Sequence, residues 1–566
     1  MNPDSFFENF SLLAETPNGI QKLREMILQM AVQGKLVPQN PDDEPAEVLL
    51  EMIRVEMVRL AKDGIIKKSA NLPSVEVDEI AYEIPDNWYW TRLGTIGIIN
   101  PKNNVSDDLD VSFIPMTLLS EKYGDDVVYD TRSWKEIKKG YTHFAENDVV
   151  VAKITPCFQN GKSAVMKGLK NGVGAGTTEL YVFRSITEYT YPYYVLLYFR
   201  SPQFIQKGIT KTTGTANQKR IPRDYFLQNP FPLPPLEEQK RIVAKVDQLM
   251  ELCDQLESLQ QQKQESRIHL NNAALNKMLE TGSPEEFAEN WRLVCDNFGL
   301  LYDNLENVEK LRQAILQLAV MGKLVEQDDR DEPAEVLLEK IRDEKEKLVK
   351  EGEIRNSKPL PSIEKEENPF ELPHNWKWER LGNLVSLLGD GLHGTPNYSE
   401  HGDYFFINGN NLKNGKIIVK SNTKTVSLEE FNKHKKSLNE NTVLVSINGT
   451  LGNVAFYNNE KVILGKSACY FNLLGNLDKF YIKILIETGY FLDYAFENAT
   501  GSTIKNVSLK SMRLFLVPLP PLEEQKRIVA KVDQLMELCD QLESNIRQAQ
   551  EDGERLMEAA VNDLLE

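Results

Sequence analysis

The 566-residue sequence is long enough for about four domains, and its hydrophobic content of 41% supplies material for several buried cores. It has no long apolar run, no charged-then-apolar leader and no CxxC pair among its five cysteines, so we expect a soluble cytoplasmic protein without membrane helices, disulfides or a zinc site. The net charge of −18 argues against a nucleic-acid partner, but residues 95–231 carry 17 basic and 13 acidic side chains and residues 383–517 carry 14 and 11, so both segments are mildly basic.

Residues 1–86 are predicted to form an N-terminal helical block. Apolar side chains recur at helical intervals over residues 22–37. In the next segment Asp43 can cap a helix, Pro45 suits its first turn, and Gly64 suits its C-terminal cap. The excess acid of the chain lies in such helical segments, where it indicates either a solvated surface or a docking face for basic partner proteins.

A tryptophan pair follows in IPDNWYWTRLG (residues 84–94) and again in LPHNWKWERLG (residues 372–382). On a strand, Trp88 and Trp90 would face the same side. A base-stacking platform is one interpretation of this pair. We prefer a core position, because large aromatic side chains at the start of a domain commonly supply its buried surface.

Two β-rich domains are predicted at residues 87–234 and 375–520. Both contain short β-type runs between Gly, Asn and Thr loops, and each holds one aromatic helical stretch, at residues 192–200 and 479–495. The two domains differ strongly in sequence, whereas the segments around them match. This pattern indicates two binding domains that share one scaffold and recognise different targets.

An exact duplication organises the chain: the 27 residues PLPPLEEQKRIVAKVDQLMELCDQLES occupy positions 232–258 and recur 286 positions later at 518–544. The apolar positions Ile242, Val246 and Leu249 begin a 4-3-4-3 spacing that is typical of a coiled coil.

We predict from this spacing two long coiled-coil helices, at residues 235–280 and 521–566, that pair with each other. A second helical block is predicted at residues 281–374, because DEPAEVLLE of residues 43–51 recurs at 331–339.

Motifs for catalysis are missing from the sequence. The Asn/Asp/Ser-Pro-Pro-Tyr/Phe tetrapeptide of amino-methyltransferases does not occur. Gly161-Lys162-Ser163 and Gly465-Lys466-Ser467 lack the upstream glycine of a phosphate-binding loop, and the histidines are scattered. We therefore predict no catalytic, cofactor-binding or metal-binding residue in this chain.

The order of these motifs resembles the specificity subunit of type I restriction–modification systems. The resemblance rests on W-x-W-x-x-L-G, a variable domain that ends in a TG-T/S loop, and PLPPLEEQKRIV before a long helix, all of it present twice. Residues 389–418 and 499–512 also resemble the target recognition domains of that family. The N-terminal helical block is longer than in many members.

This resemblance implies an α+β fold: a tandem pseudo-two-fold repeat of two β-rich target recognition domains, separated by two long antiparallel coiled-coil helices, with duplicated helical blocks. It implies a non-catalytic subunit whose recognition domains each bind one half of a bipartite, asymmetric double-stranded DNA target. The implied partners are two methyltransferase subunits, which methylate adenine N6 with S-adenosylmethionine, and restriction (motor) subunits, which use ATP and Mg²⁺. A pseudo-dimeric coiled-coil scaffold whose variable domains bind proteins stays open as the alternative.

Binding of specific DNA needs hydrogen-bonding groups for base edges and cations for phosphates, and polar loops can supply both, although such loops are also common solvent turns. For the first recognition domain we predict DNA contacts from Lys153, Gln159, Asn160, Lys162, Thr213, Thr215, Asn217, Gln218, Lys219 and Arg220. For the second we predict contacts from His393, Thr395, Asn408, Asn410, Asn411, Asn448, Thr500, Ser502, Thr503, Lys505 and Asn506.

Overall fold

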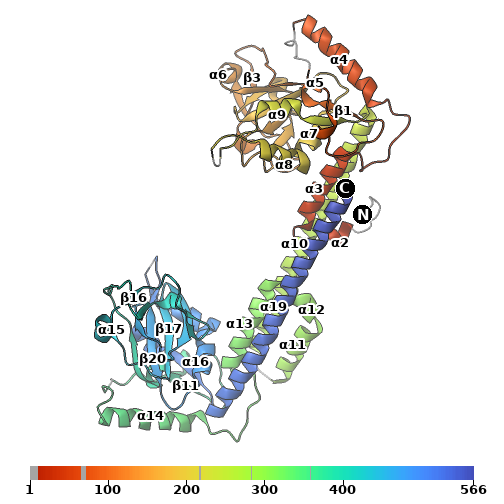
Figure 1. Cartoon of the computed structure of the whole chain (residues 1–566). Coiled ribbons are helices and arrows are strands. Elements are labelled where there is room, and N and C mark those ends of the chain that lie inside the picture. The colour runs from red at the N-terminus through yellow and green to blue at the C-terminus, as the bar shows by residue number, and fades with distance from the viewer. Residues whose placement is uncertain are drawn as a thin grey trace. The chain divides into compact units, whose positions relative to one another are not determined.

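The computed structural model describes residues 10–64, 72–215, 218–281, 284–356, 358–501 and 503–565 (Figure 1). The chain divides into two compact units, one formed by Met1–Gln264 with Gln548–Glu566 and the other by Glu265–Arg547. Each unit contains one helical block, one β-rich domain and a part of each long helix. The predicted α+β repeat is therefore confirmed.

The helical block of the first unit comprises α2 (Phe10–Ala14), α3 (Gly19–Gln33) and α4 (Ala46–Lys62). The predicted capping role of Asp43 is wrong: Pro45 holds the N-cap position of α4, and Asp43 instead forms a 2.6 Å ion pair with Arg241. Gly64 follows the C-cap of α4 with a φ of 71°, a left-handed conformation that favours glycine.

The first recognition domain is closed by antiparallel pairing of β1 (Tyr89–Arg92) with β10 (Pro230–Leu233), its first and last strands. It contains one sheet of order β2-β9-β6-β7 and another of order β4-β3-β8-β5, in which β3 and β8 are parallel. The remaining elements are α5 (Leu93–Ile96), β2 (Gly97–Ile99), β3 (Asp110–Ile114), β4 (Asp130–Ser133), α6 (Trp134–Ile137), β5 (Thr142–Ala145), β6 (Val149–Ala152), β7 (Ser163–Val165), β8 (Val173–Gly176), β9 (Leu180–Ser185), α7 (Pro192–Arg200), α8 (Pro202–Lys211) and α9 (Arg223–Gln228).

The helical block of the second unit comprises α11 (Pro284–Asp296), α12 (Phe298–Leu301), α13 (Leu305–Val320) and α14 (Ala334–Lys350). Antiparallel pairing of β11 (Lys377–Arg380) with β23 (Leu516–Leu519) closes the second recognition domain, as in the first. The two domains therefore start and end in the same way although their interiors differ.

The largest sheet of the second domain has the order β12-β20-β17-β22-β21, with β18 also paired to β17, and a smaller sheet has the order β16-β13-β19. Its elements are β12 (Val385–Asp390), β13 (Tyr404–Ile407), η6 (Gly409–Asn411), β14 (Leu412–Lys413), β15 (Lys416–Ile417), β16 (Thr425–Val426), α15 (Leu428–His434), β17 (Thr442–Asn448), β18 (Thr450–Phe456), β19 (Val462–Leu464), β20 (Ala468–Leu473), α16 (Lys479–Ile486), α17 (Gly489–Glu497), β21 (Ala499–Thr500), β22 (Asn506–Val507) and α18 (Leu509–Leu514).

One predicted helix of this domain is in fact two. The stretch 479–495 is divided into α16 and α17 at Thr488, whose hydroxyl donates to the carbonyl of Leu485 and accepts from the backbone N–H of Phe491 at 3.2 Å. A threonine that caps a new helix in this way ends the preceding one. The other aromatic stretch forms α7 over the predicted residues.

The long helices are α10 (Leu236–Glu280) and α19 (Leu522–Leu565), and α10 ends at the residue that the sequence indicates. In the first unit, the early part of α10 shares a core with the late part of α19; in the second unit, the late part of α10 shares a core with the early part of α19. The helices are therefore antiparallel. The buried members from the two helices are Ile242, Val246, Cys253, Met557 and Ala560 in the first core, and Ala274, Leu275, Met278, Ile528, Val532 and Cys539 in the second.

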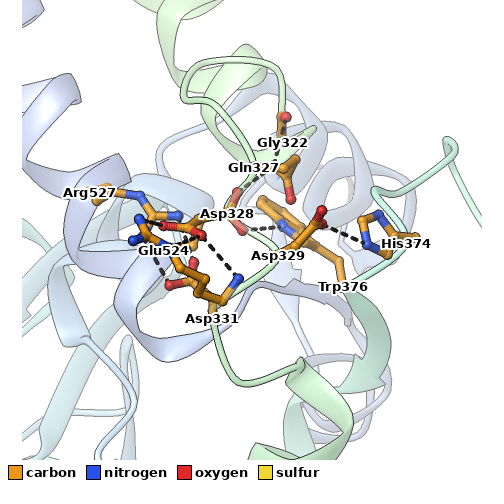
Figure 2. Close-up of polar contacts among 10 residues, drawn as sticks. Gly322, Gln327, Asp328, Asp329, Asp331, His374, Trp376, Glu524 and Arg527 are labelled. Atoms are coloured by element: carbon orange, nitrogen blue, oxygen red, sulfur yellow. Dashed lines mark hydrogen bonds and ion pairs between the residues drawn. The ribbon is translucent and has the colours of Figure 1, made fainter.

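Polar side chains at the start of each long helix anchor that helix to its own unit. In the second unit, buried Glu524 accepts hydrogen bonds from the indole nitrogen of Trp376 (2.9 Å) and from Nε2 of Gln327 (2.6 Å) (Figure 2). Beside it, Arg527 forms a 2.6 Å ion pair with Asp331. Burial raises the pKa of the Glu524 carboxyl, although its two hydrogen bonds oppose the shift.

Part of this anchoring recurs in the first unit, where Nε2 of Gln39 donates to Glu238 at 2.6 Å and Arg241 pairs with Asp43. Among the described residues, the second carboxylate oxygen of Glu238 and the indole nitrogen of Trp88 have no hydrogen-bond partner. The next residue in each copy, Gln239 or Gln525, is fully buried. Its side-chain oxygen accepts the N–H of the residue that caps the aromatic helix of the domain, Tyr191 at 2.7 Å or Asp478 at 3.0 Å. The duplicated sequence therefore builds the same docking contact twice.

Candidate nucleic-acid interface

Both tryptophans that begin the paired motifs are core residues, because Trp88 and Trp376 are buried at 5% and 3% exposure. Their rings contact Tyr194 and Tyr481 edge-on. The preferred core interpretation is confirmed for these two, and neither can stack on a base. The candidate interface lies in the polar loops instead.

In the first recognition domain, the loop between α8 and α9 is closed by two backbone hydrogen bonds between Thr213 and Arg220, of 3.0 and 2.8 Å. It lies along the residues that follow β6, because the carbonyl of Lys219 accepts from Thr155 and the carbonyl of Lys153 accepts from Ile221. The structure thus brings together six predicted residues, Lys153, Thr213, Thr215, Gln218, Lys219 and Arg220. Asn217 lies outside the described residues.

The charges of this loop are partly neutralised. The guanidinium of Arg220 binds both carboxylate oxygens of Glu179, at 2.8 and 2.9 Å, and it lowers the pKa of that carboxyl. Lys219 is exposed, and so are two cations that the sequence prediction did not include, Lys211 at the end of α8 and Arg223 at the start of α9. Lys211 and Arg223 lie near each other and near the loop because the hydrogen bonds between Thr213 and Arg220 bring the two ends of the loop together. The sequence alone did not reveal this closure.

Gln159, Asn160 and Lys162 have different surroundings. Gln159 and Asn160 line a cleft of about 1760 Å³, to which the described residues of the loop 213–220 do not contribute, and Nδ2 of Asn160 donates to Glu121 at 3.0 Å. The ammonium of Lys162 is 3.8 Å from the same carboxylate. The lining of the cleft also includes Asp247, Glu251, Asp254 and Glu257 from α10. The side chains of Asn160 and Lys162 both lie near the carboxylate of Glu121, although the carbonyl of Lys162 accepts from the N–H of Ala152, the residue before Lys153.

In the second domain, three predicted residues, Asn408, Asn448 and Asn506, belong to one hydrogen-bonded rim. Nδ2 of Asn448, the last residue of β17, donates to Oδ1 of Asn506, the first residue of β22, at 2.9 Å. The neighbouring backbone N–H of Ile447 donates to the carbonyl of Ser467 at 3.0 Å, and the hydroxyl of Ser467 donates to Oδ1 of Asn408 at 3.1 Å. Residues from three separate segments thus meet at one end of the β17–β18 hairpin.

The amide of Asn411 is used inside the domain. Its Oδ1 accepts from the backbone of Asn408 at 3.0 Å, its Nδ2 donates to Ile418 at 2.8 Å, and its side chain is buried. Asn411 therefore positions the η6 turn, while Asn410 is exposed beside it. His393 is exposed and contacts Asp390 at 2.7 Å.

Four further predicted residues belong to exposed loops. Thr395 lies in the loop after β12, and Thr500, Thr503 and Lys505 lie in the β21–β22 hairpin, in which Gly501 has a φ of 98°. Ser502 lies outside the described residues.

The sequence prediction missed two residues of this rim, Lys466 and Ser467. Ser467 bridges Asn408 and Ile447, and Lys466 is exposed next to it. Both belong to the triplet Gly465-Lys466-Ser467, which lacks the upstream glycine of a phosphate-binding loop. The cation and hydroxyl of this triplet were the sequence signal that could have indicated a place in the rim. The rim can offer amide and hydroxyl groups to base edges and ammonium groups to phosphates.

Within the described ranges, no group of three or more His, Cys, Asp and Glu side chains could hold a metal ion. Among the same residues, none of the helices has the length and apolar character needed to cross a membrane.

Comparison with known proteins identifies the family. Residues 85–265 and 373–551 match the type I restriction modification DNA specificity domain. The chain is 41% identical to the specificity subunit of the type I restriction enzyme EcoAI from Escherichia coli, over 96% of this chain and 94% of that protein. It is 37% identical to the EcoEI specificity subunit from the same organism, over 96% and 94% of the two chains. A solved HsdS subunit from Thermoanaerobacter tengcongensis aligns with 86% of this chain and 98% of its own, at 19% identity and a TM-score of 0.45.

The two family matches cover both recognition domains and the duplicated helix starts that anchor them. The two relatives align with 96% of this chain and over 94% of their own length. The chain therefore belongs to the specificity subunits of type I restriction–modification systems.

Proposed function

We propose that this specificity subunit is a non-catalytic DNA-binding protein whose two recognition domains each bind one half of a bipartite, asymmetric double-stranded target. The observation that carries the proposal is the contrast between the constant and variable parts. The side-chain oxygens of Gln239 and Gln525 accept the same kind of backbone hydrogen bond in the two units, whereas the domains that precede these residues have different sheets and different polar rims. Two unlike domains on like anchors suit a target with two unlike halves.

The proposed partners are two methyltransferase subunits and, for restriction, motor subunits. In this proposal the partners bind S-adenosylmethionine, ATP and Mg²⁺, and this chain binds no cofactor. The DNA substrate places the expected site of action in the cytoplasm. The domain limits predicted from the sequence, including 87–234 and 375–520 for the recognition domains, belong to the same proposal.

Genome-wide mapping of N6-methyladenine tests the DNA-binding role. A host that carries this chain with its methyltransferase is expected to show one split motif. Exchange of residues 383–517 for the corresponding segment of another specificity subunit should change one half of that motif and leave the other intact. No motif despite expression of both proteins, or a change in both halves, would contradict the proposal.

A second assay tests the non-catalytic role. The purified chain, incubated alone with S-adenosylmethionine and DNA that contains the mapped motif, should transfer no methyl group, and addition of the methyltransferase subunit should restore transfer. Methylation by the chain alone would show that it carries its own catalytic site.

A further inference from the structure

The pair Asn448–Asn506 is a fixed polar group at the rim of the second recognition domain. The two residues are cross-strand partners on β17 and β22, and their amides are joined by a 2.9 Å hydrogen bond. The backbone around them is fixed as well, because the N–H of Gly449 donates to the carbonyl of Lys505 at 3.0 Å. Both side chains are half-buried. The pair is therefore held in place before any ligand binds.

Two joined amides leave a defined set of unused groups. Each amide has one oxygen and one NH₂ group, and one hydrogen bond between them uses an oxygen of one and an N–H of the other. Whichever amide donates, the pair retains one unused oxygen and one unused NH₂ group. Among the described residues, no other protein group pairs with the Asn448 oxygen or the Asn506 NH₂ group. The pair can therefore accept one hydrogen bond and donate another.

The charges beside the pair are positive. Lys505 precedes Asn506 and is exposed, and Lys466 is exposed next to Ser467, whose carbonyl is bonded to the residue before Asn448. Cations on both sides of a fixed donor and acceptor suit a nucleic-acid base between two phosphates. In the major groove, adenine alone presents an acceptor, N7, next to a donor, the N6 amino group, whereas guanine presents two acceptors there.

We infer that the Asn448–Asn506 pair recognises one adenine in the half-site of the second recognition domain, with the Asn506 NH₂ group donating to N7 and the Asn448 oxygen accepting from the N6 amino group. This inference rests on the proposed DNA-binding function and assigns a base and two atoms to it. The Asn448–Asn506 pair thereby acts as a specificity-determining group, while Lys466 and Lys505 bind the backbone.

The variant Asn506→Asp separates this role from a structural one. Aspartate keeps an oxygen that can accept the hydrogen bond of Asn448, but it has no NH₂ group to donate to N7. Asn459→Asp is the matched control, because it makes the same change of charge in an exposed turn. This turn follows the end of β18 at Phe456, whereas Asn448 pairs with Thr450 at the start of that strand.

The experiment uses the specificity subunit in complex with its methyltransferase and DNA duplexes in which single adenines of the half-site are replaced by 7-deazaadenine, which lacks N7. At one adenine, this replacement should weaken binding by the native complex and the Asn459→Asp complex about tenfold, as expected for loss of a base-edge hydrogen bond. It should not weaken binding by the Asn506→Asp complex any further. If Asn506→Asp yields too little complex, Asn506→Ala, which also lacks the NH₂ group, serves in the same cycle.

Equal losses in the native and variant complexes at every adenine would overturn the inference, and so would coupling to 7-deazaguanine instead. Failure of the DNA-binding proposal gives a separate result. In that case the mapping of N6-methyladenine with the native complex would show no split motif, and there would be no half-site in which to replace adenines.

Discussion

The indole nitrogen of Trp376 lies 2.9 Å from Oε2 of Glu524, so the first strand of the second recognition domain and the helix that leaves this domain meet at one buried carboxylate. Glu524 is 1% exposed and also accepts from Gln327, which follows α13. One side chain therefore joins the helical block, the domain and the long helix of the second unit (Figure 2).

Replacement of Glu524 by alanine should destabilise the second unit by about 2–6 kcal/mol, because two donors lose their acceptor and each such loss costs about 1–3 kcal/mol. The change is measured as the free energy of unfolding in urea. Glu523→Ala is the matched control, since Glu523 is exposed and pairs only with Lys526 on the surface. This control should cost less than about 1 kcal/mol. Equal effects of the two variants would contradict the anchoring role of Glu524.

A glycine at the end of α13 provides a second test of the same junction. Gly322 has a φ of 70°, and a Cβ atom there would lie 2.5 Å from Cγ of Pro373. Gly322→Ala should therefore cost about 1–2 kcal/mol for the left-handed backbone and a further 1–3 kcal/mol, roughly, for overpacking.

The control for this prediction lies at the end of the next helix. Gly352 has a φ of 75°, and a Cβ atom there would meet nothing within 4 Å. Gly352→Ala should show the backbone cost alone, about 1–2 kcal/mol. If the two variants unfold at the same urea concentration, Pro373 does not crowd the position of Gly322, and the predicted overpacking is wrong.

The parts of the fold that depend on local pattern were predictable from the sequence. The heptad spacing that begins at Ile242 indicated α10 up to Glu280, and the aromatic stretch after Pro192 indicated α7. Exact repetition also indicated that the two units share a framework. It could not show why the repeat is kept, because the partners of Gln239, such as the N–H of Tyr191, lie 48 residues away in the chain.

The candidate site was predictable as a set of loops but not as an arrangement. Asn448 and Asn506 are 58 residues apart and become neighbours only through the pairing of β17 with β22. Conversely, Asn160 resembles the other loop residues in sequence, but the fold turns it toward the carboxylate of Glu121. Composition identifies donors and cations, whereas long-range strand pairing decides which of them share a surface.

The first unit should lose part of its stability in acid through Glu79. The buried guanidinium of Arg92 and, to a smaller extent, the backbone N–H of Glu76 lower the pKa of Glu79 from 4.5 to about 2. A depressed folded-state pKa means that the unfolded chain binds the proton more readily. The contribution of Glu79 is therefore fully present above about pH 4.5, the unfolded pKa, and is lost as the pH falls to about 2.

Glu79→Gln makes this prediction measurable. The difference in unfolding free energy between the native protein and the variant should be constant from pH 7 to about pH 4.5 and then shrink toward pH 2. Glu76→Gln controls for the change of charge on the same exposed turn, because Glu76 makes no ion pair with Arg92. A difference that does not vary with pH would show that Arg92 does not hold the Glu79 carboxylate.

The rim of the second domain should contribute to the salt dependence of DNA binding. Lys466 and Lys505 are exposed on either side of the Asn448–Asn506 pair, and each phosphate that a lysine neutralises adds about 0.9 to the slope of log Kd against log salt. Lys466→Ala should therefore reduce this slope by about 0.9 and weaken binding to specific and non-specific DNA alike. Fluorescence anisotropy of the complex with its methyltransferase, measured over a range of salt concentrations, gives the slope.

Lys461→Ala is the control for this measurement. Lys461 and Lys466 flank the two ends of β19, Val462–Leu464, and both are exposed, so the two variants lose the same charge from opposite ends of one short strand. The Lys461 ammonium lies 5.8 Å from the ring centroid of Tyr404, away from the Asn448–Asn506 pair along the strand. Only Lys466→Ala should change the slope. An equal change in both variants would mean that the effect comes from the total charge of the domain, and that the end of β19 next to Ser467 does not lie against the DNA backbone.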